Sequence, residues 1–310
     1  MRWLASYVMQ GRLQAVFAVT ILAVISWNMS LVGILNAAAV GLVTLRRGAN
    51  EGLITAGLAT LGSALLGLVV LGDMAPAFAT LAFIWMPTLL VSIVLRVTRS
   101  LAAAVQSGLL LGVAVVVAYF IAMPDMVAGW REILETFSKP LVEAELLTSS
   151  QRMNLIESLA PWMTGILAAG LYLQLMAGLL MARWWQAALY NPGGFRQEFH
   201  SLRLHKTLAY IAAPILVFGF NTEMSGAGLL INYAAVLLVA AYFVQGLAFV
   251  HGLMALIGAH GGWLIAMYVL LIVALPNMFG LLFAAGYADA WFDFRARFQA
   301  KKDAGDGPID

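Results

Sequence analysis

Residues 228–262 read GLLINYAAVLLVAAYFVQGLAFVHGLMALIGAHGG, and this stretch decides the fold class. It belongs to a longer run, 224–288, that contains no Asp, Glu, Lys or Arg. A helix needs about 20 apolar residues to cross the hydrocarbon core of a bilayer, so this run can supply at least two crossings. The glycine-rich break at 258–262 predicts a boundary between two helices, at about 228–256 and 263–285.

The composition extends this prediction to the whole chain. Of its 310 residues, 63% are hydrophobic and 10% are charged, whereas a soluble domain has about 45–50% apolar and about 25% charged residues. We therefore predict an all-α fold, a polytopic transmembrane bundle of about 8–9 hydrophobic helices with amphipathic interfacial helices. The chain, 1–310, is expected to form one integral membrane domain. It has no cysteine, which excludes disulfides and thiolate metal sites.

The other predicted spans are also runs without ionisable side chains. These runs are 13–45, 52–72, 74–95, 100–124, 158–182 and 207–222. The run 13–45 is too long for one helix, and we divide it at residues 27–30. The run 207–222 is short and contains Pro214, so it is the weakest span and leaves the count at eight or nine.

Arginine positions predict the orientation. Cytoplasmic loops are enriched in Lys and Arg, and arginines recur after every second predicted crossing. The recurring positions are Arg2 and Arg12, Arg46 and Arg47, Arg96 and Arg99, and Arg183, Arg196 and Arg203. We expect a multi-pass protein of the bacterial inner membrane with a cytoplasmic N-terminus. The polar C-terminal tail, 287–310, carries both signs of charge, so the side of the C-terminus stays open.

The segment 125–157 is more acidic than basic and is expected outside. Trp130, Ile133 and Phe137 share one helical face, and we expect that helix to end at Pro140. Thr148 with Gln151 resembles a capping box that opens a second helix. The pair either lies flat on the outer surface or forms a lid over an outward-facing pocket.

A basic island marks the opposite side. Residues 184–206 are expected to form a cytoplasmic interfacial helix, anchored by Trp184 and Trp185. Its candidate contact residues are Gly193, Gly194, Arg196, His200 and Arg203. They could anchor the chain to lipid headgroups, or they could bind a phosphate or the acidic patch of a partner.

Two further sets of residues lie within predicted spans. Small side chains at Thr55, Ala59, Ser63 and Gly67 form a ridge along one helix face. Such a ridge serves packing inside the bundle or docking of another membrane subunit. Gln174, Gln245 and His251 are the first candidates for a ligand site. Because they are uncharged, they favour a small neutral or apolar ligand.

Known catalytic motifs are absent from the sequence. There is no HExxH pair, no GxSxG elbow and no Walker loop. We expect no enzyme activity, no cofactor and no metal site, since the four histidines are scattered. Nucleic acid is not an expected partner, because the charges of the tail nearly cancel.

Four stretches together carry a resemblance. They are Arg46-Arg47-Gly48 with Gly52, NPGGFRQEFHSLRL at 191–204, QGLAFVHGL at 245–253 and GYADAWFDFRAR at 286–297. In combination they resemble the YybS-like family of uncharacterised bacterial integral membrane proteins, over most of the chain. That family is distantly similar to the S components of energy-coupling-factor transporters, which bind vitamins or metal ions and dock on a shared transport subunit and ATPases.

The resemblance implies a substrate-binding function of the transport type. The alternative function is a membrane scaffold or assembly factor, acting through the basic helix and the small-residue ridge.

Overall fold

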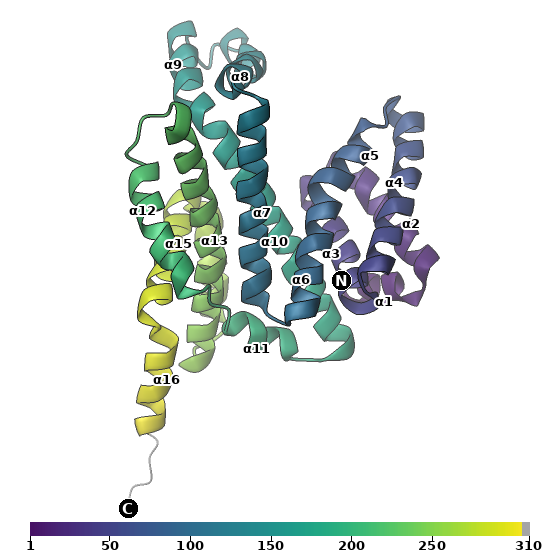
Figure 1. The fold of residues 1–310 in the computed structure, drawn as a ribbon, viewed down its shortest axis with the longest axis vertical. Coiled ribbons are helices and arrows are strands. Elements are labelled where there is room, and N and C mark those ends of the chain that lie inside the picture. The colour runs from purple at the N-terminus through teal and green to yellow at the C-terminus, as the bar shows by residue number, and fades with distance from the viewer. Residues whose placement is uncertain (306–310) are drawn as a thin grey trace, which may run out of the picture. The chain divides into compact units, whose positions relative to one another are not determined.

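The computed structural model describes the backbone of residues 1–305 and the side chains of residues 1–300 (Figure 1). The last residues of the predicted polar tail, 306–310, lie outside the described part. Every regular element within the described residues is helical, which confirms the predicted all-α class. The chain forms two compact units. Unit 1 contains residues 1–108, 173–209 and those from 241 onward, and unit 2 contains 109–172 and 210–240.

Unit 1 holds most of the helices. Its elements are α1 (Arg2–Gln10), α2 (Arg12–Ser26), α3 (Ser30–Arg47), α4 (Ala49–Leu71), α5 (Ala75–Thr80), the π-helix η1 (Leu81–Trp85), α6 (Met86–Thr98), α11 (Gly194–His200), α14 (Gly262–Val273), α15 (Leu275–Phe292) and α16 (Phe294–Gly305). Unit 2 holds α8 (Met126–Glu143), α9 (Ser149–Leu159) and the 3-10 helix η2 (Ala160–Trp162). Four helices contribute residues to both units: α7 (Leu101–Ala122), α10 (Met163–Tyr190), α12 (Lys206–Gly219) and α13 (Gly226–Leu256).

Six helical stretches are long and apolar enough to cross a membrane. They are Ser30–Arg47, Ala49–Leu71, Ala75–Thr98, Leu101–Ala122, Ser149–Tyr190 and Gly226–Leu256. Shorter apolar helices occupy Arg12–Ser26, Lys206–Gly219 and Gly262–Val273. Large apolar side chains such as Leu61, Leu65 and Val69 of α4 are exposed. An apolar surface of this kind suits contact with lipid tails.

Helix boundaries confirm two predicted breaks and correct one predicted helix. α2 ends at Ser26 and α3 begins at Ser30, and α13 ends at Leu256 before α14 begins at Gly262. The single helix expected at 263–285 is wrong, because α14 stops at Val273 and α15 begins at Leu275. Pro276 in the first turn of α15 explains the break at Ala274, since proline has no amide to bond the Ile272 carbonyl and its ring would clash with that carbonyl in a continuous helix. α15 then continues to Phe292, beyond the expected end of the apolar run.

In unit 2, α8 and α9 pack against each other, as Figure 1 shows. The predicted capping box is confirmed: the Thr148 amide donates to Gln151 Oε1 (2.9 Å) and the Gln151 amide donates to Thr148 Oγ1 (3.3 Å). The predicted end of α8 at Pro140 is wrong, because the helix continues to Glu143. Pro140 deprives only the Thr136 carbonyl of its helical partner, and Thr136 is exposed, so water can replace that bond.

Small residues allow α3 to pack closely on its neighbours in unit 1. Asn36 to Leu45 of α3 are all buried, and the α3 backbone lies close to α10 at Gly41 and Gly178. The ridge Thr55, Ala59, Ser63 and Gly67 on α4 is buried within the chain, where α4 packs on α2 and α3. All four ridge residues thus take part in internal helix packing in this structure.

Arginine side chains join several helix ends in unit 1. The contacts are Arg12 to Glu51 (2.5 Å), Arg47 to the Met9 carbonyl (2.8 Å), Arg96 to the Leu45 carbonyl (2.5 Å), Arg46 over the Tyr190 ring (4.1 Å) and Arg183 to Glu198. These residues belong to the start of α2 and α4, to the end of α1, α3, α6 and α10, and to α11. Five of the arginines that recur after every second predicted span, Arg12, Arg46, Arg47, Arg96 and Arg183, thus lie at one end of unit 1.

Candidate functional site

Gln245 of α13 lies at the centre of a buried polar cluster in unit 1. It is fully buried, and its Nε2 donates to the Gly286 carbonyl (2.9 Å) and to Asp289 Oδ2 (3.4 Å). Its Oε1 accepts the amide proton of Leu204 (2.9 Å). One amide side chain therefore links α13, α15 and the segment after α11.

Asp289 is a fully buried carboxylate that forms an ion pair with Arg295. The Oδ2 atom of Asp289 lies 2.7 Å from Arg295 Nη2, and the Arg295 side chain is 11% exposed. Arg295 also donates to the carbonyls of His200 (2.6 Å) and Leu202 (2.8 Å). A buried charge is tolerated only when it is paired and hydrogen-bonded. Arg295 thus holds the end of α11 on α15.

A second ion pair, between Arg203 and Asp293, completes this arrangement, and Arg203 also donates to the Ala290 carbonyl (3.1 Å). We call Gln245, Asp289, Arg295, Arg203 and Asp293 the anchor network. Residues 201–205 lie outside any helix: α11 ends at His200, and Leu202 and Arg203 do not continue the expected interfacial helix.

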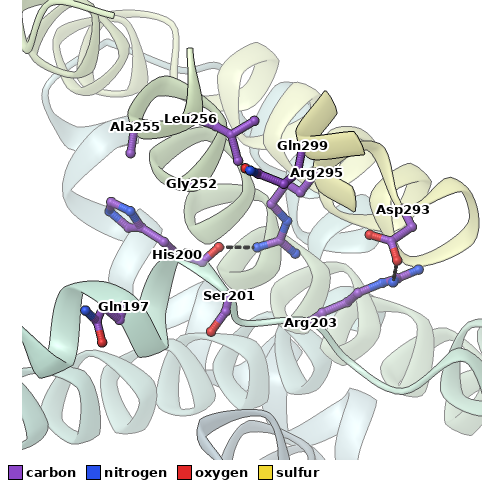
Figure 2. Close-up of a pocket in the computed structure, with 10 residues that line it drawn as sticks. All are labelled: Gln197, His200, Ser201, Arg203, Gly252, Ala255, Leu256, Asp293, Arg295 and Gln299. Carbon is purple, nitrogen blue, oxygen red and sulfur yellow. Dashed lines mark hydrogen bonds and ion pairs between the residues drawn. The ribbon is translucent and has the colours of Figure 1, made fainter. Parts of the chain in front are cut away.

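Arg203, Asp293 and Arg295 of the anchor network line an open groove of about 660 Å³. Figure 2 shows its lining residues: Gln197, His200, Ser201, Arg203, Gly252, Ala255, Leu256, Asp293, Arg295 and Gln299. The guanidinium groups of Arg203 and Arg295 are both engaged by carboxylates. In Figure 2 the His200 carbonyl is directed at Arg295, while its imidazole ring points away from that guanidinium. Because both arginines are already paired with carboxylates, they stabilise the fold and are not free to bind an anion in this groove.

A second open groove, of about 630 Å³, is lined by arginine side chains that have no acidic partner in the described part of the chain. We call it the α10–α11 groove, and it is lined by Arg2, Leu180, Trp184, Ala187, Ala188, Pro192, Gly193, Phe195, Arg196, Phe199, His200, His251 and Tyr268. Arg2 and Arg196 have no acidic partner among the residues whose side chains are described. The lining residues include no carboxylate. The groove therefore carries two uncompensated positive charges beside an aromatic wall.

The aromatic wall is ordered by ring contacts. Phe195 and Phe199 stack at 5.6 Å between centroids, and Phe199 meets the His251 ring edge-on at 5.5 Å. The Nδ1 atom of His251 lies 2.8 Å from the Leu247 carbonyl, so it carries a proton. In the neutral ring, Nε2 then accepts the Tyr268 hydroxyl proton at 3.3 Å. His251 is thus held by bonds within the chain.

His200 lines the same groove, and its surroundings shift its pKa. Burial lowers its pKa below the ordinary value, and the positive charges of Arg196 and Arg295 lower it further. The like-charged surroundings disfavour the imidazolium form. The same field would stabilise a bound anion.

The residues predicted for the site are only partly brought together. Gly193, Arg196, His200 and His251 line the α10–α11 groove, and Gly193 has the left-handed φ of +88° at the start of α11 that favours glycine. The other candidates lie elsewhere: Arg203 and Gln245 in the anchor network, Gly194 in the first turn of α11 beside Asn191, and Gln174 in a separate, mainly apolar groove of about 390 Å³.

The sequence did not predict the roles of three residues. Asp289 and Arg295 were assigned to the polar tail, and Arg2 was treated only as an orientation signal. Asp289 and Arg295 lie on either side of Asp293, which has a left-handed φ of +50° between α15 and α16, so no helical spacing in the sequence predicts their pairing. The pairing with residues 200–204 has no signal in the local sequence.

Trp184 and Trp185 have different environments. Trp184 is 40% exposed and lines the α10–α11 groove, whereas Trp185 is fully buried in the bundle. Only Trp184 is therefore available to contact a ligand or lipid.

Comparison of the chain with protein-family models, curated proteins and solved structures finds no match. The resemblance to the YybS-like family accordingly stays a prediction.

Proposed function

We propose that the chain is a multi-pass protein of the bacterial inner membrane that binds an amphiphilic anion in the α10–α11 groove. This is a substrate-binding activity of the transport type that the resemblance implies. The topology proposed with it has eight crossings, with the N-terminus and α16 on the cytoplasmic side. The gathering of arginines at one end of unit 1, where Arg295 also contacts α11, supports this topology.

One observation carries the proposal: two unpaired guanidinium groups stand beside an aromatic wall in one groove. Guanidinium groups bind carboxylate and phosphate oxygens with two parallel hydrogen bonds. Phe195, Phe199 and Trp184 offer apolar surface to the rest of a ligand. A ligand with a charged head and an apolar body therefore fits better than the small neutral ligand expected from Gln174, Gln245 and His251.

Removal of both guanidinium groups tests this function. We expect native mass spectrometry of the gently purified wild type to detect a retained anionic amphiphile. The Arg2→Gln/Arg196→Gln double variant should lose at least about 90% of that signal, because each charge-assisted contact contributes about 1.5–3 kcal/mol. The control is Arg99→Gln/Lys139→Gln, which removes two charges outside the groove. Equal retention by both double variants would contradict the proposal.

The scaffold alternative is favoured by a different surface. A groove of about 390 Å³ contains Arg96, Arg99 and Arg183 with the single carboxylate of Glu198. Arg99 is exposed, and a partner's acidic segment could bind there. A subunit that co-purifies with wild type, and is lost from Arg99→Glu but not from the Arg2→Gln/Arg196→Gln variant, would favour this alternative.

A further inference from the structure

We propose that the ligand of the α10–α11 groove is a phosphate monoester with an apolar tail, of the phosphatidic acid type, rather than a phosphate diester. This inference rests on the proposed function and specifies the head group. It follows from the charge, the donors and the apolar surface of the groove.

The charge of the groove matches a dianion. Arg2 and Arg196 supply two permanent positive charges, and no carboxylate lines the groove. A phosphate diester carries one negative charge and would leave one guanidinium uncompensated. A phosphate monoester has a second pKa of about 6 and carries about 1.5–2 negative charges near neutral pH. It can therefore neutralise both arginines.

The donors of the groove match the oxygens of a monoester. Its three terminal oxygens can accept hydrogen bonds from Arg2, from Arg196 and from the His200 ring. The His251 ring is bonded to Leu247 and Tyr268 and is not free to donate. The His200 ring has no hydrogen-bond partner among the described side chains, so it is the available third donor.

The apolar surface of the groove matches an acyl chain. Leu180, Trp184 and Phe199 line it together with the cations, and Phe195 stacks on Phe199. A free phosphate or a phosphorylated sugar would leave these rings in contact with water. Burial of apolar area is favourable by about 25 cal/mol per Å², which favours a ligand whose tail covers them.

The test uses the full-length protein in phosphatidylcholine nanodiscs. Three probes are titrated: dioleoyl phosphatidic acid, dioleoyl phosphatidylglycerol and water-soluble glycerol 3-phosphate. We expect phosphatidic acid to bind at least about tenfold more tightly than phosphatidylglycerol, and glycerol 3-phosphate to bind more weakly than phosphatidic acid.

Two single variants identify the site. Arg196→Gln and Arg2→Gln should each lower the affinity for phosphatidic acid about tenfold and reduce its preference over phosphatidylglycerol, because each removes one guanidinium. Arg196→Lys keeps the charge but loses the two-point contact, so it should restore part of the affinity. Lys139→Gln on α8 is the control and should bind as wild type does.

The outcomes separate this inference from the proposed function. Equal affinity for the two lipids, lost in Arg196→Gln, would overturn the monoester assignment and keep an amphiphilic anion as the ligand. Binding of glycerol 3-phosphate as tight as that of phosphatidic acid would overturn the apolar tail. Failure of both lipids to bind above the phosphatidylcholine background would overturn the inference and the proposed function together.

Discussion

Replacement of Asp289 by alanine is expected to destabilise the folded protein by about 3–5 kcal/mol. Removal of one partner of a buried ion pair leaves the other charge buried without compensation, and the penalty has this size. Arg295 would lose its carboxylate while it stays 11% exposed, and Gln245 would lose one of its acceptors. The measurement is the unfolding free energy in detergent micelles, with tryptophan fluorescence as the signal.

Two control variants test whether the loss of stability comes from the buried ion pair. Asp125→Ala removes an exposed carboxylate that makes no capping bond, and it should change stability by no more than about 0.5 kcal/mol. The pair Asp289→Leu/Arg295→Met replaces both charges with apolar groups, and it should be less destabilised than the sum of the two single changes. If Asp289→Ala is no worse than Asp125→Ala, the anchor network does not hold α11 to α15.

Replacement of Gly286 by alanine should destabilise the contact between α13 and α15. A Cβ atom at this position would lie 2.1 Å from the Tyr242 carbonyl oxygen and 2.5 Å from the Gly246 nitrogen, and both are backbone atoms that cannot rotate away. The helices would have to separate, and overpacking of this kind costs about 1–3 kcal/mol.

Gly280→Ala is the matched control on the same helix. A Cβ atom there meets nothing within 4 Å. Alanine is the better helix former by about 1 kcal/mol, so this change should leave stability equal or slightly higher. An equal loss of unfolding free energy in Gly280→Ala and Gly286→Ala would contradict the close contact between α13 and α15.

Local signals in the sequence were enough for several helix boundaries. The breaks at residues 27–30 and 258–262, and the capping box at Thr148, follow from glycine, polar and capping residues that act over a few positions. The end of α15 could not be predicted from local sequence signals. A search for uncharged runs stops at Asp289, whereas the structure pairs this residue with Arg295 and so permits a buried charge in the helix.

The candidate site depended on contacts distant in the sequence. Arg196 and His200 were identified from a basic stripe, but their neighbours Arg2 and His251 are distant from them and from each other in the sequence. Gln245 was proposed as a ligand contact because it is polar within an apolar run, and in the structure it bonds to Leu204 and Gly286. A polar residue in an apolar run indicates that its side chain has a hydrogen-bond partner. The sequence does not show whether that partner is a ligand or another part of the chain.

The central claim is that the uncharged runs cross the membrane and that the arginine-rich helix ends share its cytoplasmic side. The chain has no cysteine, so single-cysteine variants can be labelled with a membrane-impermeant maleimide without background. Asp73 lies in the turn after α4, and Glu51, which pairs with Arg12, lies at the start of the same helix. Asp73→Cys should therefore react in intact spheroplasts. Arg99→Cys and Asn191→Cys should react only after the membrane is permeabilised. Labelling of Arg99→Cys and Asn191→Cys from opposite sides, or of Asp73→Cys from the same side as both, would contradict the account.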